Sequence, residues 1–421
     1  MSAAEFQSNW KPRFFTIWSG QALSLVGSAL VQFALVWWLT IKTGSATTLA
    51  TASLVALLPQ IVLGPFAGAL VDRWNRRIIM IVADTLIALA TALLMALFAM
   101  DRVAVWHFYV VMFVRSLGGA FHYPAMASST SLMVPGQHLA RVAGMNQTLQ
   151  GIVNIFAPPL GALLLDLMPT QSVLAIDIGT ALAAILPLLF IAIPQPVRRT
   201  GDAGKKTSYW QDLREGFRYV VRWPGLLGII LLAMMLNFLL SPVSALTPLV
   251  VTDVFDKGAA ELGWTRAVFG AGTIVAGLIL SAWGGFRRRI VTSLSGVIGV
   301  GLGVVLFGLA PADRFFLLLV ASFLQGFAVV FANGPLQAIF QSAIAPDVQG
   351  RVFSLIGAGA AAMMPLSLLI AGPVADRQGV RFWYTFGGTV CILVTVAASF
   401  IPAIMNIERN QVTALNAQQP Q

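Results

Sequence analysis

The sequence has few charged residues, one cysteine and three histidines. Charged residues make up 10% of its 421 residues, against about 25% in a typical soluble domain, and hydrophobic residues make up 58%. Cys391 stands alone in an apolar run, which excludes a disulfide framework and a cysteine-rich metal site. The histidines, His107, His122 and His138, include no pair at metal-ligand spacing. Most of the chain is therefore expected to lie in lipid, with no metal and no cofactor.

Nucleotide-binding and catalytic motifs are also missing. The stretch "AGKKTS" at 203–208 lacks the upstream glycine of a phosphate-binding loop, so a nucleotide-driven pump is not expected. We find no nucleophile next to a base. The sequence does not indicate an enzyme.

Long apolar runs dominate what is present. A helix needs about 20 apolar residues to cross the hydrocarbon core, and continuous apolar runs favour helices over barrel strands. We predict an all-α polytopic membrane protein with twelve spans, at about 14–40, 48–71, 78–100, 104–125, 140–165, 172–193, 225–251, 263–285, 290–310, 315–340, 352–375 and 382–405.

Lysine and arginine predict the orientation. The side with both termini and the loops after even-numbered spans holds 18 of them, and the other side holds seven, Arg266 among them. Because basic residues concentrate in cytoplasmic loops, both termini are expected in the cytoplasm. The net charge of +10 then needs no nucleic-acid partner.

The longest polar stretch, 194–224, separates a six-span half at 1–193 from a second half with its tail at 225–421. Within it, Trp210, Leu213, Phe217 and Val220 have helical spacing, and Arg214, Arg218 and Arg222 recur every four residues. This pattern predicts either an amphipathic helix on the inner leaflet or an ordinary linker helix.

The two halves repeat each other. "FVRSLGGAF" at 113–121 matches "FLQGFAVVF" at 323–331, and the offset of 210 or 211 persists to "ARV" and "GRV" at 140–142 and 350–352. Arg76, Arg77 and Ile78 likewise precede Arg288, Arg289 and Ile290 by 212. An offset of six spans that preserves direction predicts two parallel six-helix repeats, the plan of the major facilitator superfamily.

The loop "GALVDRWNRR" at 68–77 resembles the signature loop of that superfamily, with its elements at Gly68, Asp72, Arg73, Arg76 and Arg77. Such a charged cluster can latch two halves of a transporter, or the arginines can serve only to fix topology. We expect Gly68 to permit close helix approach, and Asn75, where glycine is usual, to tolerate a positive φ.

Other segments, such as "NWKPRFFTIWSGQALSLVGSALVQFALVWWLT" and "RSLGGAFHYPAMASSTSLMVP", resemble the macrolide-efflux branch of the superfamily's drug:proton antiporters. The resemblance covers nearly the whole chain. It implies a monomer in the bacterial inner membrane, in contact with lipids, that exports hydrophobic or amphipathic small molecules in exchange for protons. The alternative is a siderophore-like metabolite exporter or a lysophospholipid flippase.

Two intramembrane motifs carry the same resemblance. Arg115 in span four stands where the superfamily has an arginine linked to proton coupling; the alternative is a structural ion pair. "GIVNIFAPPLGA" at 151–162 resembles the antiporter motif at Pro158 and Gly161, and Pro158 with Pro159 is expected to kink the helix.

Polar residues at helical spacing mark candidate faces for a substrate cavity. The alternative is hydrogen bonding between helices. These residues are Gln21, Ser28 and Gln32 in span one, Asn146, Gln150 and Asn154 in span five, Asn237 and Ser241 in span seven, and Gln325, Asn333 and Gln337 in span ten.

Proton coupling needs a group that titrates inside the membrane. The embedded carboxylates are Asp84 in span three and Asp177 in span six. We consider Asp84 the stronger candidate; alternatively it braces its helix end against Arg115 or the loop arginines.

Overall fold

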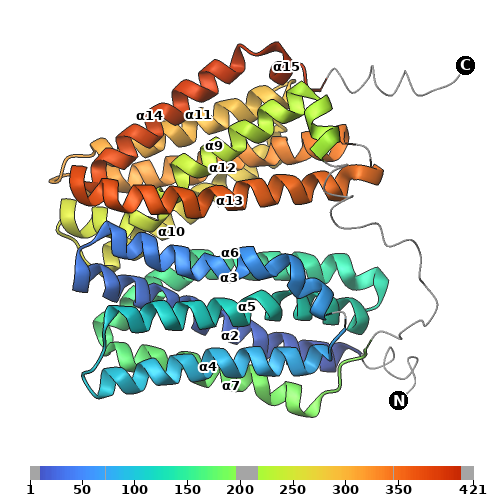
Figure 1. The fold of residues 1–421 in the computed structure, drawn as a ribbon, viewed down its shortest axis with the longest axis vertical. Coiled ribbons are helices and arrows are strands. Elements are labelled where there is room, and N and C mark those ends of the chain that lie inside the picture. The colour runs from blue at the N-terminus through green and yellow to red at the C-terminus, as the bar shows by residue number, and fades with distance from the viewer. Residues whose placement is uncertain (1–9, 72, 196–216, 345, 409–421) are drawn as a thin grey trace, which may run out of the picture. The chain divides into compact units, whose positions relative to one another are not determined.

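The computed structural model describes residues 10–71, 73–195, 217–344 and 346–408. Over these residues the protein is helical, with twelve helices of 20 residues or more (Figure 1). They are α2 (Trp10–Thr43), α3 (Ala46–Val71), α4 (Arg76–Ala99), α5 (Val105–Met133), α6 (Gly136–Leu167), α7 (Thr170–Phe190), α9 (Pro224–Leu249), α10 (Ala259–Trp283), α11 (Arg289–Leu309), α12 (Phe315–Ala343), α13 (Pro346–Gln378) and α14 (Val380–Ser399). The π-helical turn η1 (Val250–Val254) extends α9, and α15 (Pro402–Met405) follows α14.

Each long helix coincides with one predicted span, and eleven of the twelve are long and apolar enough to cross a membrane. The exception is α5, which carries Arg115 together with His107 and His122. The chain is a multi-pass membrane protein.

The prediction for the last span was wrong at its end. The span expected over 382–405 ends at Ser399, and Phe400 and Ile401 separate α14 from the short α15. Pro402 has no N–H to continue the helix, and its ring disfavours the helical conformation at Ile401. Ile401 accordingly has an extended backbone, with φ −85° and ψ 110°.

The chain divides into two compact units. Unit 1 holds α2 to α7 with the first residues of α10, and unit 2 holds α9, η1, the rest of α10 and α11 to α15. In unit 1, α2 packs on α6 and α7, α4 packs on α5 and α7, and α3 packs on α5. In unit 2, α9 packs on α13 and α14, and α11 packs on α12 and α14. There α10 also packs on α12, because a Cβ atom on Gly272 would lie 2.4 Å from the Phe323 carbonyl oxygen. The same pairs of helices therefore meet in both units, as a six-helix repeat requires.

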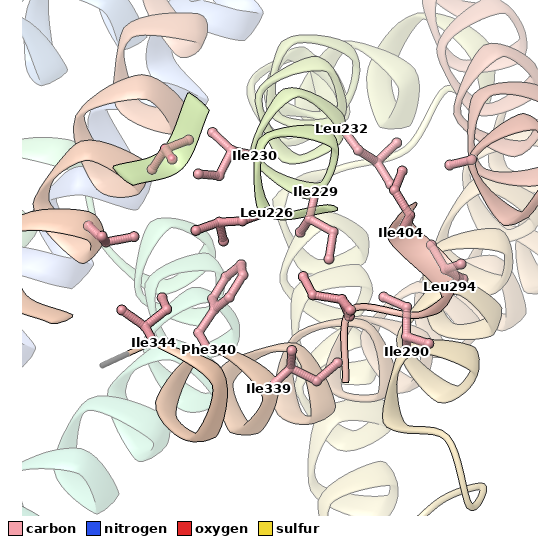
Figure 2. Close-up of a cluster of buried hydrophobic side chains, with 14 residues drawn as sticks. Leu226, Ile229, Ile230, Leu232, Ile290, Leu294, Ile339, Phe340, Ile344 and Ile404 are labelled. Carbon is pink, nitrogen blue, oxygen red and sulfur yellow. The ribbon is translucent and has the colours of Figure 1, made fainter. Parts of the chain in front are cut away.

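Apolar side chains fill the core of each unit. In unit 2 a buried cluster joins the start of α9 to α11, α12 and α15: Leu226, Ile229, Ile230 and Leu232 lie close to Ile339, Phe340 and Ile344 and to Ile290, Leu294 and Ile404 (Figure 2). A Cβ atom on Gly225 would lie 2.3 Å from the Ala403 carbonyl oxygen, so α15 packs directly against the backbone of α9. The break before Pro402 thus lets α15 pack on the core of unit 2.

Prolines inside α9 free two backbone carbonyls, and side chains occupy both. Pro242 cannot donate to Phe238 and Pro248 cannot donate to Ser244, because proline lacks an N–H. The Ser367 hydroxyl on α13 donates to the Phe238 carbonyl, and the Arg266 guanidinium on α10 donates to the Ser244 carbonyl. Both helices are thereby fixed against α9.

The predicted amphipathic segment is described only in part. Residues 217–222 are helical, with Phe217 exposed and Val220 buried. Trp210, Leu213 and Arg214 lie outside the described residues.

Candidate functional site

A buried ion pair crosses the interior of unit 1. Arg115 on α5 donates to Asp177 on α7 with Nη1–Oδ2 at 2.5 Å, and their side chains are 9% and 1% exposed. The Thr91 hydroxyl on α4 lies 3.0 Å from the same Asp177 oxygen, and the Ser28 hydroxyl on α2 donates to the other at 3.1 Å. Three other helices therefore supply partners to the Asp177 carboxylate. Arg115 pairs with Asp177 and not with Asp84, so the expected bracing of Asp84 against Arg115 was wrong.

Asp84 belongs to a second polar cluster. Its Oδ2 accepts a hydrogen bond from the Gln21 side-chain amide at 2.9 Å, and its Oδ1 lies 3.3 Å from Nε2 of His122. The imidazole is at ion-pair distance without hydrogen-bond alignment. Asp84 is 5% exposed, whereas His122 is 20% exposed. Water thus reaches this carboxylate most directly past His122.

The two clusters share a geometric rule. Gln21 and Ser28, Asp84 and Thr91, and Arg115 and His122 are each seven residues apart on α2, α4 and α5. Seven residues are nearly two helical turns, or about 10.5 Å along the axis, and return to the same face. The polar residues therefore form two layers, one closed by Asp177 and the other holding Asp84. Sequence reasoning missed His122, although its spacing from Arg115 was a usable signal.

A pocket of about 300 Å³ opens beside the Asp84 layer, between α2, α5 and α6. The other lining residues are apolar or aromatic, such as Trp18, Leu25, Tyr123 and Met126, and the polar groups come from Gln21, His122, Thr130, Asn146, Gln147 and Gln150. Neutral amides on such a wall suit an amphipathic ligand. Asp84 lies directly behind this wall, because both of its partners line the pocket.

The predicted polar face of span five is open, and its members bond to α2 and to each other. Asn146 accepts a hydrogen bond from the Trp18 indole at 2.7 Å, and Gln150 donates to Asn154 at 3.0 Å. All three amides are exposed, and Asn146 and Gln150 line the pocket. In span one only Gln21 does so, because Ser28 bonds to Asp177 and Gln32 is exposed elsewhere.

In unit 2 the predicted polar residues do not form one face. Asn237 donates to Ala233 and Ser241 to Asn237, each four residues back on α9, and Asn333 donates to Val329 on α12. Asn333 and Gln337 are exposed. Gln325 is instead buried and donates to the Gly303 carbonyl at 3.3 Å, since its position differs by about 80° from that of Asn333 around the helix.

Comparison with known proteins identifies the family. Residues 17–367 match the family model described as Major Facilitator Superfamily. The chain belongs to the Major Facilitator Superfamily. It is 36% identical over 406 residues to Macrolide efflux protein A of Streptococcus pyogenes, covering 96% of this chain and 99% of that one. It is also 25% identical to the Multidrug efflux pump Tap of Mycolicibacterium fortuitum, covering 91% and 94% of the two chains.

Solved structures agree on the fold. The nucleoside transporter NupG has a TM-score of 0.72 at 13% identity, covering 93% of this chain and 100% of that one. A bacterial homologue of the human lysosomal transporter Spinster has a TM-score of 0.67 at 14% identity, covering 95% and 98%. The all-α superfamily fold expected from the sequence is confirmed.

The loop predicted to resemble the superfamily's signature loop follows α3. Asp72 lies outside the described residues, and Arg73 is exposed. Arg76 is buried and donates to the Ser128 carbonyl at 3.1 Å, while Arg77 donates to the Leu188 and Leu189 carbonyls at the end of α7. Two of the loop's arginines thus fasten helix ends within unit 1, which topology alone would not require.

Two details of this loop differ from the prediction within unit 1. A Cβ atom on Gly68 would meet nothing within 4 Å among the described residues, so this glycine does not serve a close helix contact inside unit 1. Asn75 has φ −70° rather than a positive φ, and its side chain caps α4 by accepting from the backbone N–H groups of Arg77 and Ile78. Asparagine is favoured at this position because its short amide reaches the free N–H groups of the first turn.

The segment predicted to resemble the antiporter motif lies in α6, which continues through Pro158 and Pro159 as one helix. Gly161 is buried, and a Cβ atom there would lie 2.9 Å from the ring of Phe33 on α2. This glycine therefore allows α6 to pack closely on α2.

Proposed function

We propose that this protein exports hydrophobic or amphipathic drugs of the macrolide type across the bacterial inner membrane in exchange for protons. The observation that carries the proposal is the 36% identity to Macrolide efflux protein A over 96% of the chain. The pocket in unit 1 supports it, because neutral amides on an apolar and aromatic wall suit an amphipathic ligand better than a small ion.

We place the exchanged proton on Asp84, with His122 as its path to the pocket. Asp177 is held by an arginine and two hydroxyls, so protonation would break a satisfied network. Asp84 has an amide and an imidazole as partners, and both of these line the pocket. Histidine changes charge readily near neutral pH, which suits it to pass a proton. Arg115 and Asp177 then serve as the rigid ion pair behind this site.

The proposal includes the topology of the molecule. The chain acts as a monomer with both termini in the cytoplasm, in contact with membrane lipids, and its partners are the substrate and protons. The distribution of basic residues supports this orientation.

Transport by the purified protein tests the proposal. Proteoliposomes with an imposed proton gradient should accumulate radiolabelled erythromycin, and dissipating the gradient should abolish accumulation. Lysophospholipid and a hydroxamate siderophore serve as competing substrates in parallel samples. Accumulation of either of these without any macrolide transport would contradict the proposed substrate class.

Gln150→Leu tests the pocket. The variant should raise the macrolide concentration needed for half-maximal transport several-fold and leave the melting temperature unchanged, because the residue is exposed on the pocket wall. Gln32→Leu is the matched control, since Gln32 is an exposed glutamine outside the lining of this pocket. Equal effects of the two substitutions would show that this pocket does not bind the macrolide.

A further inference from the structure

Unit 2 contains a pocket of about 290 Å³ between α9, α10, α11 and α12. Arg266 lies in its wall with Ser244, Thr247, Thr265, Ser322 and Gln325, and the apolar part includes Phe269 and Phe307. None of the residues that line it is an aspartate or a glutamate. The pocket thus combines one guanidinium, several neutral polar groups and an aromatic wall.

The position of Arg266 differs from the sequence-based expectation of a loop charge. It lies seven residues after the first residue of α10, or about 10.5 Å along the helix axis. A charged side chain inside a spanning helix costs up to about 3 kcal/mol on insertion scales unless a partner or water compensates it. The charge of Arg266 therefore calls for an explanation beyond topology.

The protein partners of Arg266 are neutral. Among the described residues its guanidinium donates to the Ser244 hydroxyl at 3.1 Å and to the Ser244 carbonyl at 2.7 Å. A guanidinium has five N–H donors, so these two bonds leave donors free to bind a ligand in the pocket. Arg115 in unit 1 shows the contrast, since its charge is balanced by Asp177.

The repeat explains why no carboxylate is present. At the offset of 210, Arg115 corresponds to Gln325, and at the offset of 212, Thr91 corresponds to Gly303. Gln325 donates to the Gly303 carbonyl, so a neutral contact stands in unit 2 where unit 1 has its arginine and threonine. Arg266 is thus not half of a repeated ion pair, and among the described residues it forms no ion pair with a carboxylate.

We infer that this pocket binds a small organic carboxylate, with Arg266 holding the carboxylate and Phe269 and Phe307 contacting an apolar body. A guanidinium matches a carboxylate with two parallel hydrogen bonds and repels a cationic group. This pocket shares no lining residue with the pocket proposed for drug export, and its test requires no transport.

The test measures binding of 4-phenylbutyrate and of its neutral amide, 4-phenylbutyramide, to the full-length protein in phosphatidylcholine nanodiscs. We expect saturable binding of the acid and at least tenfold weaker binding of the amide. R266Q should weaken binding of the acid at least tenfold. R266K should bind the acid with an intermediate affinity, because lysine keeps the charge without the planar pair of donors. Gln150→Leu, in the other unit, should leave acid binding unchanged.

A second variant separates ligand binding by Arg266 from its hydrogen bond to the Ser244 carbonyl. P248A restores the backbone N–H that can donate to the Ser244 carbonyl. The melting temperature of the P248A/R266Q double variant should therefore be close to that of P248A. It should still lose binding of the acid.

Three results would overturn the inference. One is equal affinity for the acid and the amide, and another is unchanged affinity in R266Q. The third is acetate and chloride binding as tightly as 4-phenylbutyrate, which would make this a site for small ions with no role for the aromatic wall.

Discussion

At the scale of single residues, the two buried carboxylates of unit 1 differ in what surrounds them. Asp177 receives a guanidinium and two hydroxyls from three other helices, whereas Asp84 has one amide and one imidazole. A carboxylate with the first set of partners holds helices together. One with the second set can exchange a proton with less rearrangement, because the imidazole beside it lines a pocket.

Asp177→Ala is expected to destabilise unit 1 strongly. It would leave the Arg115 guanidinium buried without its carboxylate, and breaking a buried pair in this way costs about 3–5 kcal/mol. The melting temperature of the purified protein in detergent measures the loss. Asp313→Asn is the control, because its pair with Arg314 is exposed and should contribute under about 1 kcal/mol. If the two variants melt alike, Asp177 does not anchor the four helices.

Sequence reasoning recognised the buried charges but not their pairing. Asp84, Arg115 and Asp177 stand out because charges are rare inside apolar spans. Which carboxylate meets Arg115 depends on the rotation of α4, α5 and α7 about their axes, which span boundaries do not define. His122 was missed because metal-ligand spacing was the only pattern applied to the histidines.

At the scale of helices, unit 2 replaces polar layers by close packing. At the offset of 212, Asp84 corresponds to Gly296, and at the offset of 210, His122 corresponds to Ala332. A Cβ atom on Gly296 would lie 2.3 Å from the Ala332 backbone nitrogen. The backbones of α11 and α12 therefore meet where unit 1 holds its carboxylate and imidazole.

Gly296→Ala should consequently lower stability by about 1–3 kcal/mol, because the added methyl forces the two backbones apart. Gly151→Ala in α6 is the matched control. Its Cβ would meet nothing within 4 Å, and alanine is favoured over glycine in a helix by up to about 1 kcal/mol. Thermal unfolding of both variants compares the effects, and a stabilising Gly296→Ala would contradict the close contact.

The prolines of α9 lead to a second prediction about helix packing. Ser367→Ala should leave the Phe238 carbonyl unpaired and lower stability by about 1–3 kcal/mol. In a Pro242→Ala background, the same substitution should have a much smaller effect, since the helix then supplies its own donor. Equal effects of Ser367→Ala in both backgrounds would show that proline does not create the need for the serine.

Helix positions could be predicted from the sequence better than helix ends. Apolar length places all twelve long helices, because crossing a membrane fixes their approximate extent. The ends depend on local chemistry, as at Pro402, which stops α14, and at Asn75, which caps α4. The two prolines inside α9 are plain in the sequence, but the sequence does not show which side chains bond to the carbonyls that they free. Those side chains come from α10 and α13.

At the scale of the whole molecule, the repeat was visible in the sequence as a constant offset, and each unit packs the same pairs of helices. What the offset could not reveal is how the copies have diverged. Unit 1 keeps buried carboxylates, whereas the pocket of unit 2 has an arginine and no acid in its lining.

The orientation of the chain can be tested by labelling with a membrane-impermeant maleimide in a Cys391→Ser background. Cysteines replacing Asp101, between α4 and α5, and Asp313, between α11 and α12, should react in intact cells. A cysteine replacing the exposed Arg73 should react only after the membrane is permeabilised. The reverse pattern would place the termini outside the cytoplasm.

We propose that drug movement is coupled to protons through Asp84. Proton movement induced by substrate tests this coupling most directly. Proteoliposomes containing a pH-sensitive dye receive erythromycin without an imposed gradient, and the internal pH is followed. We predict a pH change with the wild type and none with Asp84→Asn, while Asp84→Asn still exchanges labelled for unlabelled erythromycin at a measurable rate. A pH change of wild-type size in Asp84→Asn would show that Asp84 does not couple drug movement to protons.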